Sequence, residues 1–561
     1  MIGVALLALT MVGYAPAVSA AGDTASPREA RPAAVGQDRP WSAGHAQAAW
    51  PALTRQAPKN IPPAGVDAQT YQWEKAAAVR GPAAIAAQVA IPRGPLPRRA
   101  SMPLIFNGLD RPGAVNNGFV FNPPDTIAGK SPSRVLEGAN SALRLFSNSG
   151  SVIATQNLNT FFGAATANGR LFDPKVYFDR NATNQRFYVV ALQVAGRDDT
   201  NTANDVSRIW VAVSRSPDPA NLSSAGWCRY NIDARRNVGT TNVSWADYPA
   251  IGAGRDTFSF AMNQFRFTNR SFTFAVIHVW NKTIASNNAA SCPTVPRFTF
   301  QPSATAGDFS RFTIQPAQHY TSPSSFTGTT NPAYYLSTRR GSSNEYHAYR
   351  VRNVASGSPT LAQLVLTSTS YGIPPSSPQP SSSILVDTGD NRMLQAAGIG
   401  NDVAGIFNTV CNFTAGTPNE SCTLAPRVVV GQNSGGSFTA SIAENTFAGF
   451  GDNVFVHHSS IARNSALQAA STWEFGGPTT RLSSASMIKN VNGAWAGVLT
   501  YAPGTCSLSA TAPSTTTARS GDYSGAQTDP SNLSSFWLAG EQAVTISGTC
   551  QWRTRIGSLV P

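Results

Sequence analysis

The chain has 561 residues, of which 42% are hydrophobic and 13% charged, and its formal net charge is +13. The apolar fraction suffices for a large core, whereas the charged fraction is about half of the usual ~25%. Glycine triplets do not repeat, Glu and Lys are scarce, and no uncharged apolar run of about 20 residues follows the N-terminus. Collagen, a coiled coil and a polytopic membrane protein are therefore excluded, and a loop-rich, all-β globular protein remains.

Residues 1–20, MIGVALLALTMVGYAPAVSA, have the features of a signal peptide. An apolar stretch runs from Ile2 to Val12, Pro16 interrupts it, and Val18-Ser19-Ala20 supplies small residues for cleavage. No Lys or Arg precedes the apolar stretch, which departs from the usual pattern. We expect a secreted or periplasmic protein without a membrane span.

Residues 21–103 are rich in Ala, Pro and Arg and contain twelve prolines. They show no sustained strand or helix period, and only Gln69–Val79 predicts a short helix. This composition predicts a disordered linker or pro-segment. Cleavage near Arg98-Arg99 is one option for its processing.

Residues 104–561 contain short alternating or β-branched runs bounded by Gly, Asn, Asp, Ser or Pro, which is the strand-and-turn pattern of an all-β fold. The runs are Arg134–Ala139, Ala142–Phe146, Val176–Phe178, Arg186–Val194, Arg208–Ser214, Thr257–Met262, Ser271–Trp280, Ala333–Leu336, Tyr346–Val351, Leu361–Thr367, Arg427–Val430 and Val454–His458.

A loose internal repeat underlies these runs, because a motif with a polar lead residue recurs about every 66 residues before a strand of buried type. Its copies start at Pro124-Asp125, Asp173-Pro174, Asp247-Tyr248, Asn331-Pro332, Asp390-Asn391, Asp452-Asn453 and Asp522-Tyr523. A four-stranded propeller blade needs about 40–50 residues, which leaves room for loops. The repeat predicts one β-propeller with seven blades, or six as the alternative. A pair of sandwiches is a further alternative, but it predicts no Asp at each repeat start.

One repeat shows the blade clearly. Within residues 173–233, PKVYFD, RFYVVALQV, RIWVAVSRS and GWCRYNI read as four successive antiparallel strands. The last repeat, which begins at Asp522, is one strand short. We expect Met102–Phe106, near the other end of the chain, to supply that strand and close the ring.

The six cysteines form an even set without a CxxC motif. Six cysteines allow 15 pairings, and their order along the chain suggests Cys228–Cys292, Cys411–Cys422 and Cys506–Cys550. In an oxidising compartment these bridges are structural. Their spacing fits no zinc site.

The positive charge comes from 36 Arg against 6 Lys. The arginines are scattered, and the only adjacent pairs are Arg98-Arg99, Arg235-Arg236 and Arg339-Arg340. Nucleic-acid binding would need basic stripes with interleaved aromatic residues, so we expect no nucleic-acid partner. The arginines reflect either codon usage or an acidic partner that guanidinium groups grip in a bidentate manner.

The lead aspartates of the repeat would ring one mouth of the central channel if each begins an innermost strand. Each carboxylate either caps a turn by accepting backbone N–H groups or joins a polar ring that binds calcium or glycan hydroxyls. No DxDxDG loop is present, so no cofactor is predicted and calcium is only an option. The predicted ligand-binding residues are Asp125, Asp173, Asp247, Asp390, Asp452 and Asp522.

Candidates for catalysis overlap with this set. Glycoside hydrolysis needs two carboxylates roughly 5–10 Å apart, for which Asp247 with Asp522, or with Asp173, would serve. Polysaccharide lyase chemistry needs a His or Tyr base beside a cation, and the residues of the right type are Tyr248, Tyr523, His347, His457, His458 and Arg392. We expect the neighbours His457 and His458 to place one ring inward and one in solvent. Hydrolysis by a Ser/His/Asp triad lacks its GxSxG motif.

Several segments together resemble a group of exported bacterial β-propeller proteins, mostly of unassigned activity and distantly similar to the sialidase-like propellers. They are NPPDTIAG (122–129), LRLFSNSG (143–150), FDPKVYFDR (172–180), AVSRSPDP (212–219), DYPAIG (247–252), GDYSG with DP (521–530), Phe536-Trp537 and WRTRI (552–556). The resemblance covers about residues 118–557. Ser520 departs from the group, which commonly has Trp there. Repeated Ser-x-Asp-x-Gly-x-x-Trp boxes of true sialidases are absent, so the sialidase arginine triad is not carried over.

These features lead to two functional hypotheses for a monomeric exported propeller. The first is a binding module that holds an extracellular glycan or protein surface at the channel mouth. The alternative is a carbohydrate-active enzyme, a glycoside hydrolase or polysaccharide lyase, acting on an acidic polysaccharide. A purely structural surface protein is a third option.

Overall fold

A computed structural model describes residues 29–41, 66–82 and 100–561, apart from short stretches at 116–120, 166–168, 181–183, 196–204, 239, 241–242, 288–290, 304, 321–331, 432–437 and 512–513. The predicted signal peptide and the dibasic pair Arg98-Arg99 lie outside the described residues.

Most of the described chain forms antiparallel groups of four consecutive strands. The first three groups are β3 (Ile127–Lys130), β4 (Arg134–Ala139), β5 (Ala142–Ser147) and β6 (Val152–Asn157); β7 (Leu171–Asp179), β8 (Arg186–Ala195), β9 (Val206–Ser214) and β10 (Trp227–Asp233); and β11 (Ser244–Ala253), β12 (Thr257–Arg266), β13 (Phe272–Asn281) and β14 (Val295–Phe300).

The next three groups follow the same order. They are β15 (Gln315–His319), β16 (Ala333–Thr338), β17 (Ser343–Arg352) and β18 (Thr360–Tyr371); β21 (Met393–Ile399), β22 (Asp402–Cys411), β23 (Glu420–Val430) and β24 (Ala440–Ala448); and β25 (Phe455–Arg463), β26 (Ala469–Gly477), β27 (Thr480–Lys489) and β28 (Trp495–Ala502). The seventh group consists of β30 (Gly525–Thr528), β31 (Phe536–Ile546), β32 (Thr549–Val560) and, from the other end of the chain, β2 (Ser101–Asp110). All twelve predicted strands lie in these groups.

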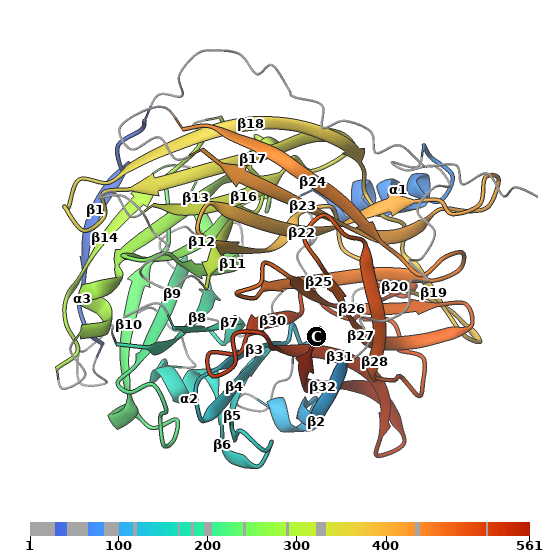
Figure 1. Ribbon diagram of the computed structural model, residues 1–561, viewed down its shortest axis with the longest axis horizontal. Coiled ribbons are helices and arrows are strands. Elements are labelled where there is room, and N and C mark those ends of the chain that lie inside the picture. Colours follow the sequence, from blue (N-terminus) through green and yellow to red (C-terminus); the bar gives the residue numbers. More distant parts are fainter. Residues whose placement is uncertain are drawn as a thin grey trace, which may run out of the picture.

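The innermost strands form a closed circle. Strands β3, β7, β11, β15, β21, β25 and β30 contact one another in this order, and β30 contacts β3 again. Figure 1 shows the chain running round the molecule from cyan through green, yellow and orange to red. A closed circle of small antiparallel sheets is a β-propeller, which confirms the predicted fold class and excludes two facing sandwiches. Seven groups of strands follow one another in this circle among the described residues.

The ring closes through the seventh group, where β2 pairs antiparallel with β32. Leu104 lies opposite Ser558, and Phe106 lies opposite Ile556; β2 and β32 lie side by side in Figure 1. The predicted closing strand is confirmed, and it begins three residues before the expected domain boundary at 104. Closure of this kind protects the sheet edge that β32 would otherwise expose.

Several strands in the middle of the groups are buried on both faces. The sequence RFYVVALQV of β8 is buried throughout, because neighbouring sheets pack against either side and remove the usual apolar–polar alternation. Between the second and third groups, the rings of Tyr188 and Phe258 stack with centroids 4.0 Å apart. The core is therefore a series of layers between adjacent sheets.

Two pieces of the segment 21–103 are ordered, which corrects the expectation of a disordered linker there. Strand β1 (Ala34–Asp38) pairs antiparallel with β14. Helix α1 (Ala68–Ala78) confirms the predicted helix, and the carboxylate of Asp67 caps it by accepting the Thr70 N–H at 2.9 Å. Composition alone missed this order because both pieces are stabilised by contacts with the propeller.

The remaining elements are short. Strands β19 (Ser377–Gln379), β20 (Ser382–Asp387) and β29 (Thr517–Arg519) form a separate small sheet. The other helices are α2 (Leu158–Phe162), α3 (Lys282–Asn287) and the single turns η1 (Pro112–Ala114), η4 (Ser224–Gly226) and η5 (Phe309–Arg311). Within the described part of the chain, no helix has the length and apolar character needed to cross a bilayer.

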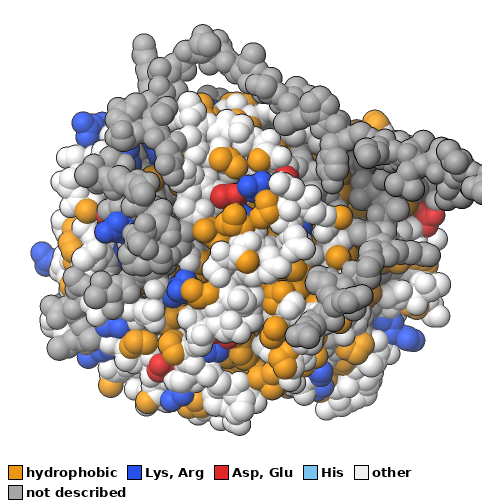
Figure 2. Space-filling model, in the orientation of Figure 1, with side chains coloured by type: hydrophobic (Ala, Val, Ile, Leu, Met, Phe, Trp, Pro, Cys, Tyr) orange, Lys and Arg blue, Asp and Glu red, His pale blue; other side chains and the backbone are white. Residues whose placement is uncertain are grey.

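Basic side chains are dispersed on the surface. On the face that Figure 2 shows, Lys and Arg lie apart from one another among apolar and uncharged polar groups, with no continuous basic stripe over the residues drawn in colour.

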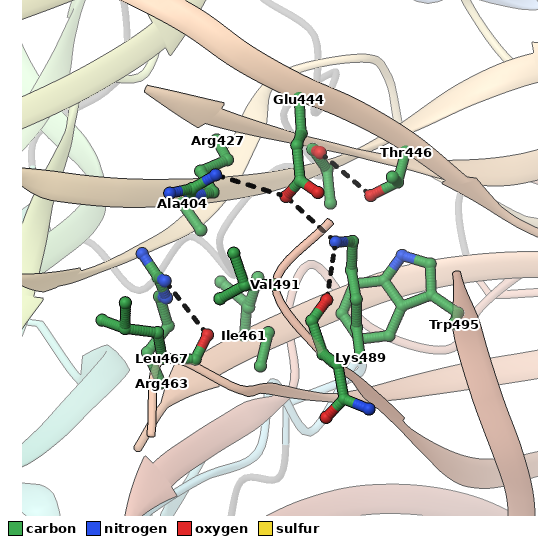
Figure 3. Close-up of a pocket in the computed structure, with 13 residues that line it drawn as sticks. Ala404, Arg427, Glu444, Thr446, Ile461, Arg463, Leu467, Lys489, Val491 and Trp495 are labelled. Atoms are coloured by element: carbon green, nitrogen blue, oxygen red, sulfur yellow. Dashed lines mark hydrogen bonds and ion pairs between the residues drawn. The ribbon is translucent and has the colours of Figure 1, made fainter. Parts of the chain in front are cut away.

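A small pocket lies between the fifth and sixth groups (Figure 3). Lys489 Nζ lies 3.0 Å from Glu444 Oε2, and Arg427 lies 2.7 Å from Asp402. Trp495 forms part of the wall. Because both carboxylates are paired with basic groups, the pocket joins two sheets through ion pairs and is assigned no ligand.

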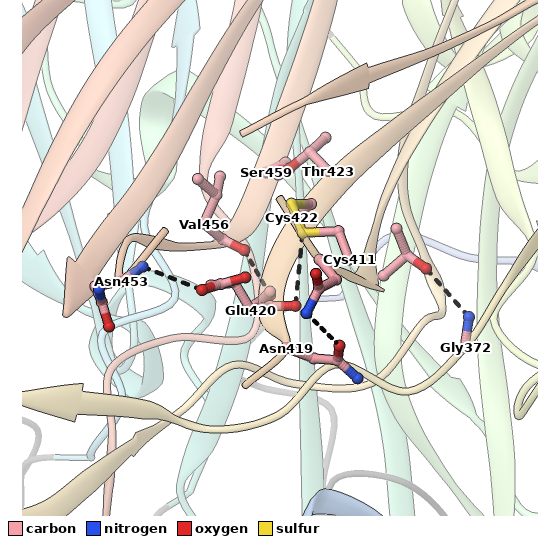
Figure 4. Close-up of a disulfide and its surroundings, with 12 residues drawn as sticks. Gly372, Cys411, Asn419, Glu420, Cys422, Thr423, Asn453, Val456 and Ser459 are labelled. Carbon is pink, nitrogen blue, oxygen red and sulfur yellow. Dashed lines mark hydrogen bonds between the residues drawn. A yellow bond between two sulfur atoms is a disulfide. The ribbon is translucent and has the colours of Figure 1, made fainter. Parts of the chain in front are cut away.

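Three disulfides match the predicted pairs Cys228–Cys292, Cys411–Cys422 and Cys506–Cys550. The second bridge joins the ends of β22 and β23 and is shown with its surroundings in Figure 4. Asn419 in that hairpin donates from Nδ2 to the carbonyls of Ala78 at 2.8 Å and Gly81 at 2.9 Å. The bridged hairpin thus binds the C-terminal end of α1.

The closing strand gives the first prediction. A chain that starts at residue 111 should lose about 3 kcal/mol or more of unfolding free energy relative to a chain that starts at residue 100, because it loses the packing of β2 and exposes the edge of β32. Both forms lack β1 and α1, so denaturant unfolding isolates the effect of β2. Equal midpoints and equal slopes would show that β2 does not close the ring.

Candidate functional site

The N-terminal ends of the innermost strands carry a recurring backbone kink. Asp125, Asp173, Tyr248 and His458 have φ values of 49°, 51°, 53° and 48°, a region that residues other than Gly rarely adopt. The last three coincide with β-bulges in β7, β11 and β25. Bulges re-aim side chains relative to strand alternation, and strained backbone of this kind is concentrated at functional sites. The kinks mark one end of the ring.

Asp125 links three of the groups at this end. Its Oδ1 accepts the backbone N–H of Asp522 at 2.7 Å, and its Oδ2 accepts Asn140 Nδ2 at 2.6 Å. Asn140 in turn accepts the N–H of Asp173 at 2.7 Å. The first, second and seventh groups are therefore connected through two polar side chains that are both buried.

The aspartates at this end act on one another electrostatically. Burial raises the pKa of Asp125 well above its usual value, and the charges of Asp522 and Asp173 raise it further. Burial likewise raises the pKa of Asp173, with Asp247 and then Asp522 adding to the effect. These shifts require the four carboxyl groups to lie close together in a weakly solvated region.

Two arginines offset this negative charge. Arg519 lies 2.6 Å from Asp522, and Arg392 holds Asp390 through two bonds of 2.7 and 2.9 Å. Burial acts to raise the pKa of Asp522, but Arg519 and Arg392 together hold it below its usual value. The pKa of Asp390 is also lowered, because Arg392 and Arg340 outweigh burial.

A lysine and two tyrosines complete the cluster. Lys175 Nζ lies 2.7 Å from the ring centroid of Tyr523 and 5.5 Å from that of Tyr248. Tyr248 donates its hydroxyl to the carbonyl of Asp522 at 2.9 Å, and Arg392 lies 4.4 Å from the Tyr248 ring. Burial holds the pKa of Lys175 well below its usual value even though three aspartates surround it.

The structure thus brings together most of the predicted site residues. The cluster at this end of the ring, called the lead-residue cluster below, consists of Asp125, Asp173, Lys175, Asp247, Tyr248, Asp390, Arg392, Arg519, Asp522 and Tyr523. Asp247, Asp522 and Arg519 are half-buried and reach its outer side. Their role in binding stays a prediction.

Asp452 does not join this cluster. It is exposed, and its Oδ2 accepts the hydroxyl of Thr414 at 2.6 Å. In the sixth group the kinked position of the innermost strand is occupied by His458 instead. The Asn331-Pro332 motif is displaced as well, since Pro332 precedes β16, the second strand of its group. The sequence motif is present there, but it does not lie at the start of the innermost strand.

The paired histidines differ from expectation. His457 and His458 are both buried, with exposed fractions of 0% and 1%, so the prediction of one ring in solvent is wrong. The two side chains do not alternate between the core and solvent, because the pairing register of β25 shifts between His457 and Ser460. His347 lies in β17, where burial lowers its pKa to about 3, and the structure does not place it with the lead aspartates.

Helix α1 lies against the loop that carries Asp390. Tyr71 donates to Asp387 at 2.8 Å, and Lys75 donates to Thr388 at 2.7 Å. Glu74 pairs with Arg340, whose Nε lies 3.6 Å from Asp390. The predicted linker therefore contributes three side chains beside the lead-residue cluster.

Sequence reasoning missed several members of this environment. Lys175 lies within a quoted motif, FDPKVYFDR, whereas Arg519 lies two residues before another, GDYSG. The signal available for Lys175 was its rarity, since a lone lysine inside an apolar strand needs a buried partner. Asn140 and Arg340 carried no comparable signal, because only the folded chain brings them to this end.

No family model matches the chain, and no curated protein sequence matches it. Among solved structures it is similar to the α-L-arabinofuranosidase Arb93A of Fusarium graminearum, at 8% identity and a TM-score of 0.34 over 81% of this chain and 97% of that one. It is also similar to the Trypanosoma rangeli sialidase (11%, 0.32, 76% and 59%) and to Drosophila Plexin A in complex with Semaphorin 1b (8%, 0.31, 82% and 87%). TM-scores in this range carry no argument about activity or ligand.

The buried ion pair predicts a non-additive pair of substitutions. Arg392→Met should cost about 3–5 kcal/mol of unfolding free energy, because it leaves Asp390 charged and poorly compensated in the interior. Adding Asp390→Asn should restore a large part of that loss. Denaturant unfolding of the four forms measures the coupling, and additive effects would contradict the pairing.

The raised pKa of Asp173 predicts a pH effect with a definite sign. A carboxyl group whose pKa is higher in the folded state stabilises the fold fully below its unfolded pKa of about 3.9, and this contribution is lost as the pH rises through the folded pKa. Asp173→Asn should therefore match the wild type near pH 4 and exceed it by about 1–3 kcal/mol at pH 7. Asp452→Asn is the exposed control, and its pH profile should parallel that of the wild type.

Proposed function

We propose that this chain is an exported β-propeller that binds a glycan at the lead-residue cluster. The observation that supports this proposal is the convergence of five aspartates, two arginines, a lysine and two tyrosines from different groups at one end of the ring. A protein that needed only closure of its ring would not require so many ionisable groups at one end.

The residue types suit a hydroxyl-rich ligand. Carboxylates accept hydrogen bonds from sugar hydroxyls and guanidinium groups donate them, and bonds with a charged partner are the stronger ones. Asp247, Asp522 and Arg519 are half-buried and are the members we assign to direct contact. The buried members, Asp125 and Asp173 among them, act as positioning residues that hold the strand ends.

The disulfides support the export part of the proposal. Three bridges connect residues 64, 11 and 44 positions apart. Such bridges persist in oxidising compartments and are rare in the cytosol of mesophiles. Together with the predicted signal peptide they favour a secreted or periplasmic protein, and the partner is accordingly an extracellular one.

Glycoside hydrolysis is the second candidate. Asp173 has a raised pKa and Asp522 a lowered one, and two carboxyl groups whose pKa values are pushed apart are the arrangement of an acid and its ionised partner. On this reading Asp173 donates the proton to the leaving oxygen, and Asp522 or Asp247 acts as base or nucleophile.

A glycan array probed with the full mature chain tests the binding proposal. Retention should fall at least about tenfold in Asp247→Asn and in Asp522→Asn, because each loses a charged hydrogen-bond acceptor. Asp452→Asn, which alters an exposed aspartate outside the cluster, should bind like the wild type. Absence of retention on every neutral and uronate-rich glycan would overturn the proposal.

Mass analysis of the retained glycans separates binding from hydrolysis. If the chain only binds, the glycans are recovered intact. If it hydrolyses them, shortened products accumulate with the wild type, and Asp173→Asn abolishes turnover while keeping retention. Cleavage that survives in both Asp173→Asn and Asp522→Asn would rule out this acid and base assignment.

A further inference from the structure

We propose that His457, His458 and Glu474 form a binding site for one divalent transition-metal ion, with Zn²⁺ as the favoured metal. The three residues lie on the adjacent strands β25 and β26 of the sixth group. The inference does not depend on the proposed glycan binding, because it concerns a different set of side chains.

The spacing of the three ligand atoms is that of one coordination shell. His457 Nδ1 and His458 Nδ1 are 3.0 Å apart, His458 Nδ1 and Glu474 Oε2 are 3.0 Å apart, and His457 Nδ1 and Glu474 Oε2 are 3.5 Å apart. Ligands bound about 2.0–2.2 Å from Zn²⁺ lie roughly 3–3.5 Å from one another. A single ion equidistant from the three atoms therefore fits these separations.

Hydrogen bonding alone satisfies this arrangement poorly. Each imidazole nitrogen carries at most one proton, yet His458 Nδ1 faces both His457 Nδ1 and Glu474 Oε2 at 3.0 Å. With a single proton or a single lone pair, His458 Nδ1 can make an ordinary hydrogen bond in only one of these two contacts. A cation turns all three lone pairs into favourable ligands.

Buried polar atoms without partners surround the same point. Glu474 Oε1 and both oxygens of Glu541 have no hydrogen-bond partner among the described residues, although Glu474 and Glu541 are 0% and 1% exposed. Glu541 lies in β31, which packs against β26, the strand that carries Glu474. Buried carboxylates are ordinarily paired or bound to metal.

Gly521 leaves room beside the three ligands. A Cβ atom at this position would lie 2.9 Å from Glu474 Oε1 and 3.2 Å from His458 Nδ1. Ser520 Oγ lies 3.5 Å from the same His458 nitrogen. Gly521, which precedes the lead aspartate Asp522, therefore keeps this space free because it has no side chain. Ser520 lies beside the same space.

The ligand set selects the class of metal. Two imidazole nitrogens and one carboxylate suit Zn²⁺ and related transition metals, whereas calcium takes six to eight oxygen ligands. This site is separate from the lead aspartates, for which calcium was considered.

The test starts from untagged protein, produced in medium that contains Zn²⁺ and purified without chelators. Plasma mass spectrometry should find about one zinc per chain, and protein produced with Co²⁺ should show the visible absorption bands of protein-bound Co²⁺. Glu474→Gln and His457→Gln should each lose most of the metal. The control His347→Gln changes a buried histidine in β17 and should retain it. Circular dichroism confirms that each variant is folded.

The outcomes are decisive in either direction. Folded wild-type protein with less than about one-tenth zinc and no Co²⁺ bands would overturn the proposal. So would equal metal content in Glu474→Gln and His347→Gln, or binding of Ca²⁺ in place of Zn²⁺. If both ligand variants fail to fold, the metal content and Co²⁺ spectrum of the wild type still decide, and glycan retention by metal-depleted protein reports separately on the proposed function.

Discussion

All innermost strands run in the same direction, and the rest of the structure depends on this constraint. Because β11, β15 and β21 pair in parallel and the ring closes through successive contacts, every innermost strand begins at the same end. Polar residues that lead each strand are then forced together, away from water. Like charges gathered in this way destabilise the fold unless cations and hydrogen bonds offset them, and Arg392 and Arg519 supply the cations. The site and the ring closure are therefore two results of one topology.

The N-terminal region supplies further partners for buried charged groups from outside the ring. Helix α1 brings Tyr71, Glu74 and Lys75 against residues that flank Asp390, and the bridged hairpin at Asn419 binds its other end.

All five lysines in the described part of the chain are likewise buried, namely Lys75, Lys130, Lys175, Lys282 and Lys489. Buried lysines require partners, so in this chain Lys serves the interior while the dispersed positive surface charge comes from Arg.

Sequence patterns predicted the strands, the closing strand and the three disulfides well, because these depend on apolar runs, turn residues and order along the chain. The repeat identified Asp125, Asp173 and Asp522 correctly as lead residues. Asp452 likewise precedes its innermost strand β25 by three residues, but it is exposed and lies outside the lead-residue cluster. The burial of both His457 and His458 could not be predicted from the sequence, because neither a β-bulge nor a residue with positive φ produces a periodic pattern of residue types. Long-range partners such as Asn140 and Arg340 were missed since neither belongs to the repeat.

The stretch Gly521-Asp522-Tyr523 contacts three neighbouring groups of strands at once. Gly521 leaves space beside Glu474 and His458, the Asp522 amide bonds Asp125, and the Tyr523 ring lies over Lys175. Three consecutive residues thus face three different neighbours, in the sixth, first and second groups. These three residues lie directly before β30, which contacts β3 where the circle closes, and they must fit both the histidine–glutamate cluster and the lead-residue cluster. A side chain added at Gly521 would push against the first cluster and displace the backbone that holds the second.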